Sequence, residues 1–399
     1  MPSSDPAAPL AITDARLPGG EITCLRIADG LVVSVGDPPS EGDEVLDARG
    51  ALVLPAMAEA HAHLDKAFLS EVVPNPTGDL MGAIIAMEEH RHLITVADTE
   101  ERAERAARLL AANGATAIRT HADTTTNNGM MSVQALLSVR DRLRSLVHIE
   151  VFALSGWPVV GEGAAPERDL LLEAIGMGVD GIGGCPHLED DSNAAIDVFL
   201  ELAGEAGLPV DLHTDEHLDG ARCTLDHLSK RVIATGFSHG VAASHCVSLG
   251  LLPDTDQARL AAALAEADIS VVALPASNLY LQGRDRQEGM PRALTAVRAL
   301  RLAGVNLAAG WDNLQDPFNP VGRGDCLETA GLMVMAGHLL PDDAYDTVAA
   351  ATRRMMGLPA AGPVVGAAAD LVVVRADSVR ETIALAPTPR TVIKGGRIQ

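Results

Sequence analysis

The sequence predicts an α/β protein, a (β/α)8 TIM-type barrel with a small β-sandwich domain built from both ends of the chain. Two observations predict the barrel. Eight apolar, strand-like runs each end in polar residues and lead into a stretch rich in Ala, Leu, Glu and Arg, which is typical of a helix. From the second run onward these units recur every 30 to 40 residues, about the length of one βα unit. A third observation predicts the small domain: both end segments read as short strands with turns, and chain termini often lie close together.

The expected elements follow in order along the chain. Strands of the small domain are expected over 11–17, 22–28 and 31–35 near the start, and over 370–375 and 391–393 near the end. The barrel strands are expected to end near the following residues: His63, Asp123, Leu154, Pro186, Glu216, Cys246, Pro275 and Asn313. Helices are expected, among others, over 101–113, 194–206, 257–267 and 291–303. The domain boundaries are therefore placed at 1–54, 55–358 and 359–399.

The connection after the first barrel strand, residues 65–113, is longer than the others and has room for a loop or lid over the barrel mouth. In a (β/α)8 barrel the active site lies at the C-terminal ends of the strands. The polar residues at the eight strand ends are therefore the candidates for a functional site.

Composition excludes several other classes of function. Hydrophobic residues make up 47% of the chain, as in globular proteins. The net charge of −24, from 30 basic and 54 acidic residues, argues against a nucleic acid partner. We expect no membrane partner, because no apolar run approaches roughly 18 residues, and the first ten residues lack the features of a secretory signal. The five cysteines are far apart and form no CxxC pair, so we expect a cytoplasmic protein without disulfides.

Imidazole and carboxylate side chains stand at four of the strand ends. His61 and His63 are two residues apart, so on a strand they face the same side and could chelate a metal ion. His213, His245 and Asp312 follow at the ends of strands five, six and eight. Each alone could be an ordinary hydrogen-bonded loop residue, but the whole set at four strand ends predicts a metal site.

Other polar residues near the strand ends have weaker claims. His121 and Asp123 are expected to be structural or to support the ligands, and for His187 and Glu189 functional and structural roles stay equally open. Further histidines are expected to be loop or helix residues, with a role in a lid as the alternative for the first two: His90, His92, His217, His227 and His239.

Several segments carry a resemblance to a known family. They are LPAMAEAHAHLDKAF, IRTHAD, GIGGCPHLE, VDLHTDEH, ASHC, NLYLQGR, GWDNLQDPFNPVG and the closing ADLVVV and VIKGGRI. In these segments, which span most of the chain, the sequence resembles the amidohydrolase superfamily and, within it, the cytosine deaminase branch. HxH alone is common, but HTDE, SHC, LQGR and WDN in this order are specific.

The resemblance implies one divalent metal ion, Zn²⁺ or Fe²⁺, and a role for each residue of the set. His245 would hydrogen-bond the activated water, Glu216 would carry a proton to the ring nitrogen, and Asp312 would also take a proton from the water. A carboxylated lysine that bridges two metals is not expected, because no lysine ends strand four and Lys66 lies in the long loop. The implied ligands are His61, His63, His213 and Asp312.

The implied activity is hydrolytic deamination of a cytosine-like N-heterocycle, in which activated water attacks a C–NH2 ring carbon and ammonia leaves. A ring substrate needs a proton donor to its own nitrogen, and Glu216, three residues after His213, fits that need. Three expected substrate contacts differ from cytosine deaminases: Ser155 stands in place of a Gln, Asn313 of an Asp and Phe318 of a Trp. The partner is thus a small N-heterocycle, and relatives imply a homo-oligomer.

Two alternatives stay open. HLDK and WDN also resemble N-isopropylammelide isopropylaminohydrolases, so the enzyme could release an alkylamine from a triazine-like ring or open a cyclic amide. A catalytically silent ligand-binding relative is the third hypothesis. The complete ligand set together with Glu216 and His245 argues against it, because a binding protein needs neither.

Overall fold

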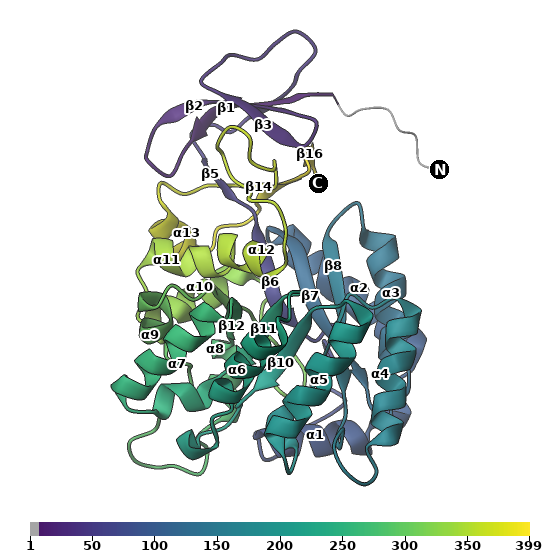
Figure 1. Ribbon diagram of the computed structural model, residues 1–399. Coiled ribbons are helices and arrows are strands. Elements are labelled where there is room, and N and C mark those ends of the chain that lie inside the picture. Colours follow the sequence, from purple (N-terminus) through teal and green to yellow (C-terminus); the bar gives the residue numbers. More distant parts are fainter. Residues whose placement is uncertain (1–7) are drawn as a thin grey trace.

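The computed structural model describes residues 8–399, so the expectation for a secretory signal rests partly on residues outside this range. Within it the chain forms two eight-stranded sheets. One sheet is parallel and nearly closed, whereas the other sheet combines strands from both ends of the chain (Figure 1). This arrangement confirms the predicted fold class. In residues 8–399 no helix is both long and apolar enough to cross a membrane.

The parallel sheet is the barrel, and its strands pair in chain order. An isolated parallel bridge between Ala62 and Asp312 joins the last strand region to the first. Its strands are β6 (Met57–Ala62), β7 (Ala115–Thr124), β8 (His148–Ser155), β9 (Gly181–Gly183), β10 (Val210–Thr214), β11 (Val241–His245), β12 (Ile269–Ala273) and β13 (Leu307–Ala309).

Four of these strands, β9, β10, β12 and β13, end two to four residues before the strand end predicted from the sequence. After β10 and β13 the chain turns through residues with positive φ, 51° at Asp215 and 77° at Asp312. Such a conformation is uncommon for a residue other than glycine, and a run of apolar residues does not indicate it.

Helices cover the outside of the barrel (Figure 1). The predicted helix 101–113 begins earlier, because Thr95 caps it by accepting a hydrogen bond from Asp98 N. The predicted helix 291–303 is wrong in its first half, since Pro291 to Ala296 form no helix. The helices after the barrel strands include α2 (Val96–Ala112), α3 (Met131–Leu143), α4 (Ala165–Met177), α5 (Ser192–Ala206), α6 (Leu225–Thr235), α7 (Asp254–Glu266), α8 (Pro275–Leu281), α9 (Val297–Leu302), α10 (Cys326–Met335), α11 (Pro341–Thr347) and α12 (Ala350–Met355).

The second sheet lies at the end of the barrel where β6 enters it, at the top of Figure 1. Leu31 forms a bridge to Ala368, so this sheet curls back on itself around its own apolar core. Its strands are β1 (Leu10–Arg16), β2 (Ile22–Ala28), β3 (Leu31–Val35), β4 (Glu44–Asp47), β5 (Leu52–Pro55), β14 (Leu371–Val374), β15 (Thr391–Lys394) and β16 (Arg397–Ile398).

The C-terminal segment also contains a helix, α13 (Val379–Leu385), so its prediction as strands and turns alone was incomplete. The residues Ser378 to Glu381 form a variant of the capping box, in which the glutamate accepts from the residue before the N-cap. Ser378 Oγ accepts from Glu381 N, and the Glu381 carboxylate accepts from Asp377 N. This S-x-x-E signal was present in the sequence. The domain boundaries 1–54, 55–358 and 359–399 stay a prediction.

Candidate active site

The backbone at the barrel mouth brings strands one and eight together. His61 lies in β6 and His63 just after it, and both side chains are buried. Asp312 N donates to His61 O at 2.9 Å, and His63 N donates to Asp312 O at 3.1 Å. The φ of 77° at Asp312 turns the chain at this point. A carboxylate is thereby fixed beside two imidazoles that come from the opposite end of the barrel sequence.

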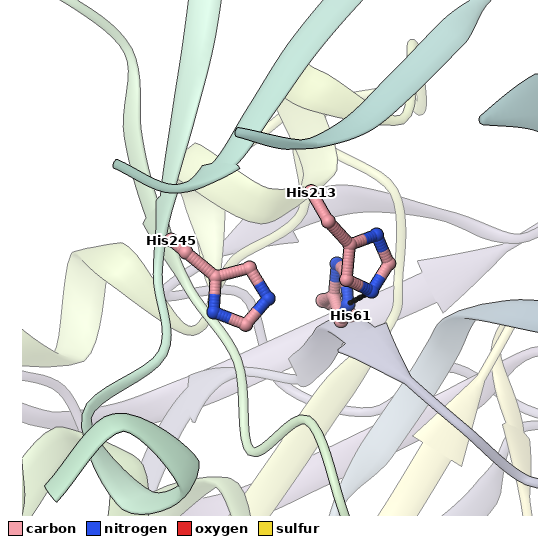
Figure 2. A group of neighbouring side chains, drawn as sticks. All are labelled: His61, His213 and His245. Carbon is pink, nitrogen blue, oxygen red and sulfur yellow. Dashed lines mark hydrogen bonds between the residues drawn. The ribbon is translucent and has the colours of Figure 1, made fainter. Parts of the chain in front are cut away.

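Ring nitrogens of three histidines meet at one point. His213, in β10, places its Nε2 3.2 Å from the Nε2 atoms of both His61 and His63. Asp312 Oδ1 lies 3.3 Å from His63 Nε2 and 3.7 Å from His61 Nε2. Figure 2 shows the interaction between the rings of His61 and His213 as a dashed line, with the ring of His245 near both. The four predicted ligands therefore converge.

The surroundings of His61 fix which of its nitrogens carries the hydrogen. Ser244 Oγ donates to Asp211 Oδ1 at 2.7 Å, so this hydroxyl oxygen is left to accept from His61 Nδ1, 3.0 Å away. Arg119 holds the other oxygen of Asp211 at 3.1 Å, and His121 Nε2 also lies 3.1 Å from His61 Nδ1. With its hydrogen on Nδ1, His61 presents a lone pair on Nε2 to the cluster, as metal-binding histidines do.

This donor set fits a divalent metal ion. Burial lowers the pKa of His61, His63 and His213, so all three rings are neutral and have lone pairs to offer. Groups of buried His and Asp atoms close enough to hold an ion include His61 with His63 and Asp312, and His61 with His213 and His245. Imidazole and carboxylate ligands suit zinc and iron alike.

Glu216 and His245 lie next to this cluster. His245 is the last residue of β11, and its φ of 68° turns the backbone at the end of this strand. Its Nδ1 lies 3.0 Å from Asn278 Oδ1 and 3.6 Å from Glu216 Oε1, and its Nε2 lies 3.9 Å from Asp312 Oδ2. Burial and the charge of Asp312 raise the pKa of Glu216 well above its usual value, so the carboxyl group favours its protonated form.

Lys66 is a buried neighbour of the cluster that the sequence analysis placed in the long loop and gave no role. Its Nζ donates to Asp123 Oδ1 at 2.7 Å and lies 3.3 Å from His63 Nδ1. Arg91 Nη2 lies 3.9 Å from the second oxygen of Asp123. The signal was the HLDK run itself, because a turn directly after β6, in which Lys66 N donates to His63 O at 3.1 Å, keeps this lysine close to His63.

A cavity of about 120 Å³ opens at the cluster. Its polar side is lined by Lys66, Asp123 and Glu216, together with His63, His213, His245 and Asp312. Helix α1 (Leu80–Glu89), from the long first connection, forms part of the apolar side, at the end of the barrel opposite the terminal sheet (Figure 1). The apolar lining consists of Leu80, Ile84, Met87, Leu154, Trp157, Leu188, Leu281 and Phe318.

The three predicted substrate contacts line the same cavity. Ser155 Oγ donates to Gly156 O at 2.8 Å, so toward a ligand it is left as an acceptor. The amide of Asn313 is engaged at both ends: Nδ2 donates to Asp316 Oδ2 at 2.9 Å, and Oδ1 accepts from Ser277 Oγ at 3.3 Å. Phe318 packs against the apolar residues of α1.

Comparison with known proteins identifies the family. Residues 77–399 match the amidohydrolase family. A pterin deaminase of Rhizobium rhizogenes is 32% identical over 386 residues, which cover 93% of this chain and 86% of that protein. Among solved structures, a 5-methylcytosine deaminase of Klebsiella pneumoniae has a TM-score of 0.89 and 28% identity, over 98% of this chain and 97% of that one. An N-isopropylammelide isopropylaminohydrolase of Burkholderia multivorans has a TM-score of 0.85 and 29% identity, over 98% of both chains. With its barrel, its buried His–Asp cluster and these matches, the chain belongs to the amidohydrolase family.

Proposed function

We propose that this protein is a metal-dependent hydrolytic deaminase, which acts on the C–NH2 carbon of a cytosine-like N-heterocycle and releases ammonia. One observation carries the proposal. The buried carboxyl group of Glu216, with its raised pKa, lines the cavity beside the His–Asp cluster, 3.6 Å from His245 Nδ1. A protonated carboxyl group there can donate to a ring nitrogen, a transfer that hydrolysis of a simple amide does not require.

The side chains around the reacting carbon divide the proton transfers among them. Asp312 takes a proton from the attacking water and delivers it to the leaving amino group. His245 Nε2, 3.9 Å from Asp312 Oδ2, aligns that water. Glu216 protonates the ring nitrogen and regains a proton from the newly added hydroxyl group as the C–N bond breaks and the carbonyl forms. A single zinc or iron(II) ion, when bound, would supply Lewis-acid activation of the water. Its proposed ligands are His61, His63, His213 and Asp312.

The relatives support an aminated ring as substrate. By their names, one deaminates pterin and another 5-methylcytosine. Both compounds contain an amino group on a pyrimidine ring. The residues proposed to contact the ring are Ser155, Asn313 and Phe318, and Phe318 belongs to the apolar side of the cavity.

A second candidate is the release of an alkylamine from a triazine-like ring, or the opening of a cyclic amide. The apolar side of the cavity, with Ile84, Met87 and Leu281, favours it because these side chains could enclose an N-alkyl group. The likeness to an N-isopropylammelide isopropylaminohydrolase supports the same reaction.

Product analysis on metal-quantified protein tests both candidates. The panel would contain cytosine, 5-methylcytosine, isocytosine, pterin, creatinine, and amino- and isopropylamino-triazines. We expect ammonia from an aminated ring. Isopropylamine or a ring-opened acid without ammonia would favour the second candidate. If the metal site is filled and none of the rings yields a product, both candidates are contradicted. The remaining hypothesis would then be a ligand-binding relative without catalytic activity. A cytoplasmic location and a homo-oligomeric state remain predictions.

A further inference from the structure

His187 is a buried histidine at the cavity that the proposed proton transfers do not use. It lies in a 3-10 turn, Pro186–Leu188, after β9. Its Nδ1 lies 2.9 Å from the backbone oxygen of His213. A carbonyl oxygen only accepts, so the ring hydrogen is on Nδ1 and Nε2 carries a lone pair. Arg222 Nη2 donates to His187 O at 2.9 Å and holds the turn in place.

The Nε2 atom of His187 is an acceptor without a donor. It is buried and has no hydrogen-bond partner among residues 8–399. His187 lines the cavity, and its Nε2 lies 4.0 Å from Glu216 Oε2. A buried polar atom left unpaired is unfavourable by an amount similar to a lost hydrogen bond. A ligand that brings an N–H to this point would therefore gain the missing contact.

We infer that His187 Nε2 binds an N–H of the substrate, on the ring carbon next to the nitrogen that Glu216 protonates. The inference rests on the proposed deamination. It defines the substrate class as aminated rings in which the nitrogen protonated by Glu216 lies between two carbons. One of these carbons carries the amino group that leaves, and the other carries a second amino or N–H group. An oxygen at the same place would face the lone pair of His187 and leave it unpaired.

The spacing of the two side chains suits this pattern. A protonated Glu216 donates to the ring nitrogen, while the neighbouring N–H donates to His187. The 4.0 Å between Glu216 Oε2 and His187 Nε2 lets two hydrogen bonds of about 2.9 Å run side by side with a slight outward splay. The two residues thus recognise a donor next to an acceptor on one edge of the ring.

Cytosine and 2,4-diaminopyrimidine are the probes, because they share the reacting C4–NH2 and carry an oxygen or an amino group at C2. They also differ at N1, which bears a hydrogen in cytosine only, so the substitutions of His187 below assign any preference to C2. Binding is measured by calorimetry on the zinc-loaded Glu216→Gln protein. Its side-chain amide still donates to the ring nitrogen, but proton transfer from the acid is blocked. We expect 2,4-diaminopyrimidine to bind about tenfold more tightly than cytosine, or better. Equal affinities for the two rings, or no binding of the diamine, would overturn the inference even before His187 is substituted.

Two substitutions of His187, each added to Glu216→Gln, form a matched pair. In His187→Asn the amide nitrogen can replace Nδ1 as the donor to His213 O, but the acceptor at Nε2 is gone. In His187→Gln an amide oxygen can reach the place of Nε2. We expect the first to remove the preference for the diamine with metal content unchanged, and the second to keep part of it. Loss of affinity for both rings alike in His187→Asn would show a structural role and overturn the inference.

Turnover of both rings by the unsubstituted zinc-loaded enzyme separates this inference from the proposed function. Deamination with a kcat/KM that favours 2,4-diaminopyrimidine supports both. Deamination that favours cytosine retains the deaminase and overturns the role of His187. If neither ring releases ammonia while the binding preference holds, the role of His187 stands and deamination of these rings is wrong.

Discussion

Burial decides what each side chain of this site can do. His61, His63 and His213 are ordinary histidines in sequence, but desolvation keeps them neutral and ready to act as ligands. The same effect raises the pKa of Asp312 to about 6 and that of Glu216 well above its usual value. One environment thus produces both lone-pair donors and a protonated acid.

His213 is central to the proposed metal site, since its Nε2 touches two of the other ligands. His213→Ala should reduce bound metal to a small fraction of one equivalent and lower activity by at least about 100-fold. Elemental analysis of the purified variant gives the metal content. His227→Ala is the matched control, because His227 contacts Asp197 on a helix surface away from the cluster. Full metal content in His213→Ala would contradict the proposed ligand set.

Glu216→Gln should retain metal and lose about 10²–10⁴-fold in kcat, because an amide cannot release a proton to the ring. Steady-state kinetics with the best substrate of the panel measures the loss. Glu205→Gln, on the exposed face of α5, should change neither value. Wild-type turnover by Glu216→Gln would show that this carboxyl group transfers no proton.

Asp316 makes the stability of the loop after β13 depend on pH. Burial raises its pKa from the usual 3.8 to about 7, although it accepts from Phe318 N, Asn319 N and Asn313 Nδ2. The folded protein therefore binds a proton that the unfolded chain releases near pH 4. Its stabilising contribution is complete below that pH and is lost as the pH rises through about 7.

Asp316→Asn should flatten this dependence, by at most about 1.4 kcal/mol per pH unit in the free energy of unfolding. Denaturant titrations at several pH values between 4 and 8, at matched metal content, give the slope. An unchanged slope would mean that Asp316 stays ionised in the folded protein.

At the scale of elements, an interrupted strand and a regular helix place the site and its apolar wall. In β6 a register shift between Glu59 and Ala62 breaks the alternation of side chains. Ala60 packs with Ala242 and Val272 of other barrel strands, whereas Glu59 lies beside Cys326 of α10 and accepts from Trp311 N at 2.8 Å. In α1, one face supplies Ile84 and Met87 to the cavity, while Ile85 is 48% exposed on the outer face. The helix thus shapes the space available to a substrate.

Ile84→Trp should narrow the cavity and lower kcat/KM for the larger rings of the panel by about tenfold, because the added volume must displace substrate or neighbours. Ile85→Trp puts the same side chain on the exposed face and should leave the kinetics unchanged. Comparison of a one-ring and a two-ring substrate in both variants measures the effect. Equal losses in the two variants would mean that α1 acts on the fold and not on the cavity.

Across the whole molecule, the terminal sheet and the barrel are linked because the same two strands contribute side chains to both apolar cores. Alternate residues of β5 and β14 face opposite sides: Val53 and Val373 pack in the core of the terminal sheet, while Leu54 and Val372 pack in the barrel core. A buried ion pair adds a second link, since Arg390 Nη2 lies 2.7 Å from Asp325 Oδ2. Unfolding of one part exposes apolar surface of the other.

Arg390→Met should lower the free energy of unfolding by about 3–5 kcal/mol, because it leaves the Asp325 carboxylate buried without its partner. Adding Asp325→Asn should recover part of this loss, since an amide oxygen can still cap α10 by accepting from Leu327 N. Urea titrations followed by two probes should show one transition in all three proteins. A double variant no more stable than Arg390→Met would argue against the uncompensated charge as the cause.

Sequence patterns alone predicted the barrel, the terminal sheet and the four residues that converge at the barrel mouth. Alternation and βα spacing are local properties, and a barrel brings all strand ends to one face, so HxH, His213 and Asp312 could be placed together from their positions alone. The capping box Ser378–Glu381 was equally local, although it was missed.

The remaining features of the site depend on contacts between segments that lie far apart in the sequence. The hydrogen of His61 is fixed by Ser244 and Asp211, which lie far from it in sequence. The burial of Lys66, the cavity wall of α1 and the unpaired Nε2 of His187 depend on how the long first connection and the turn after β9 pack over the barrel. A sequence pattern gives the face on which a side chain lies, but its solvation and hydrogen-bond partners come from distant segments, and these set its pKa and its chemistry.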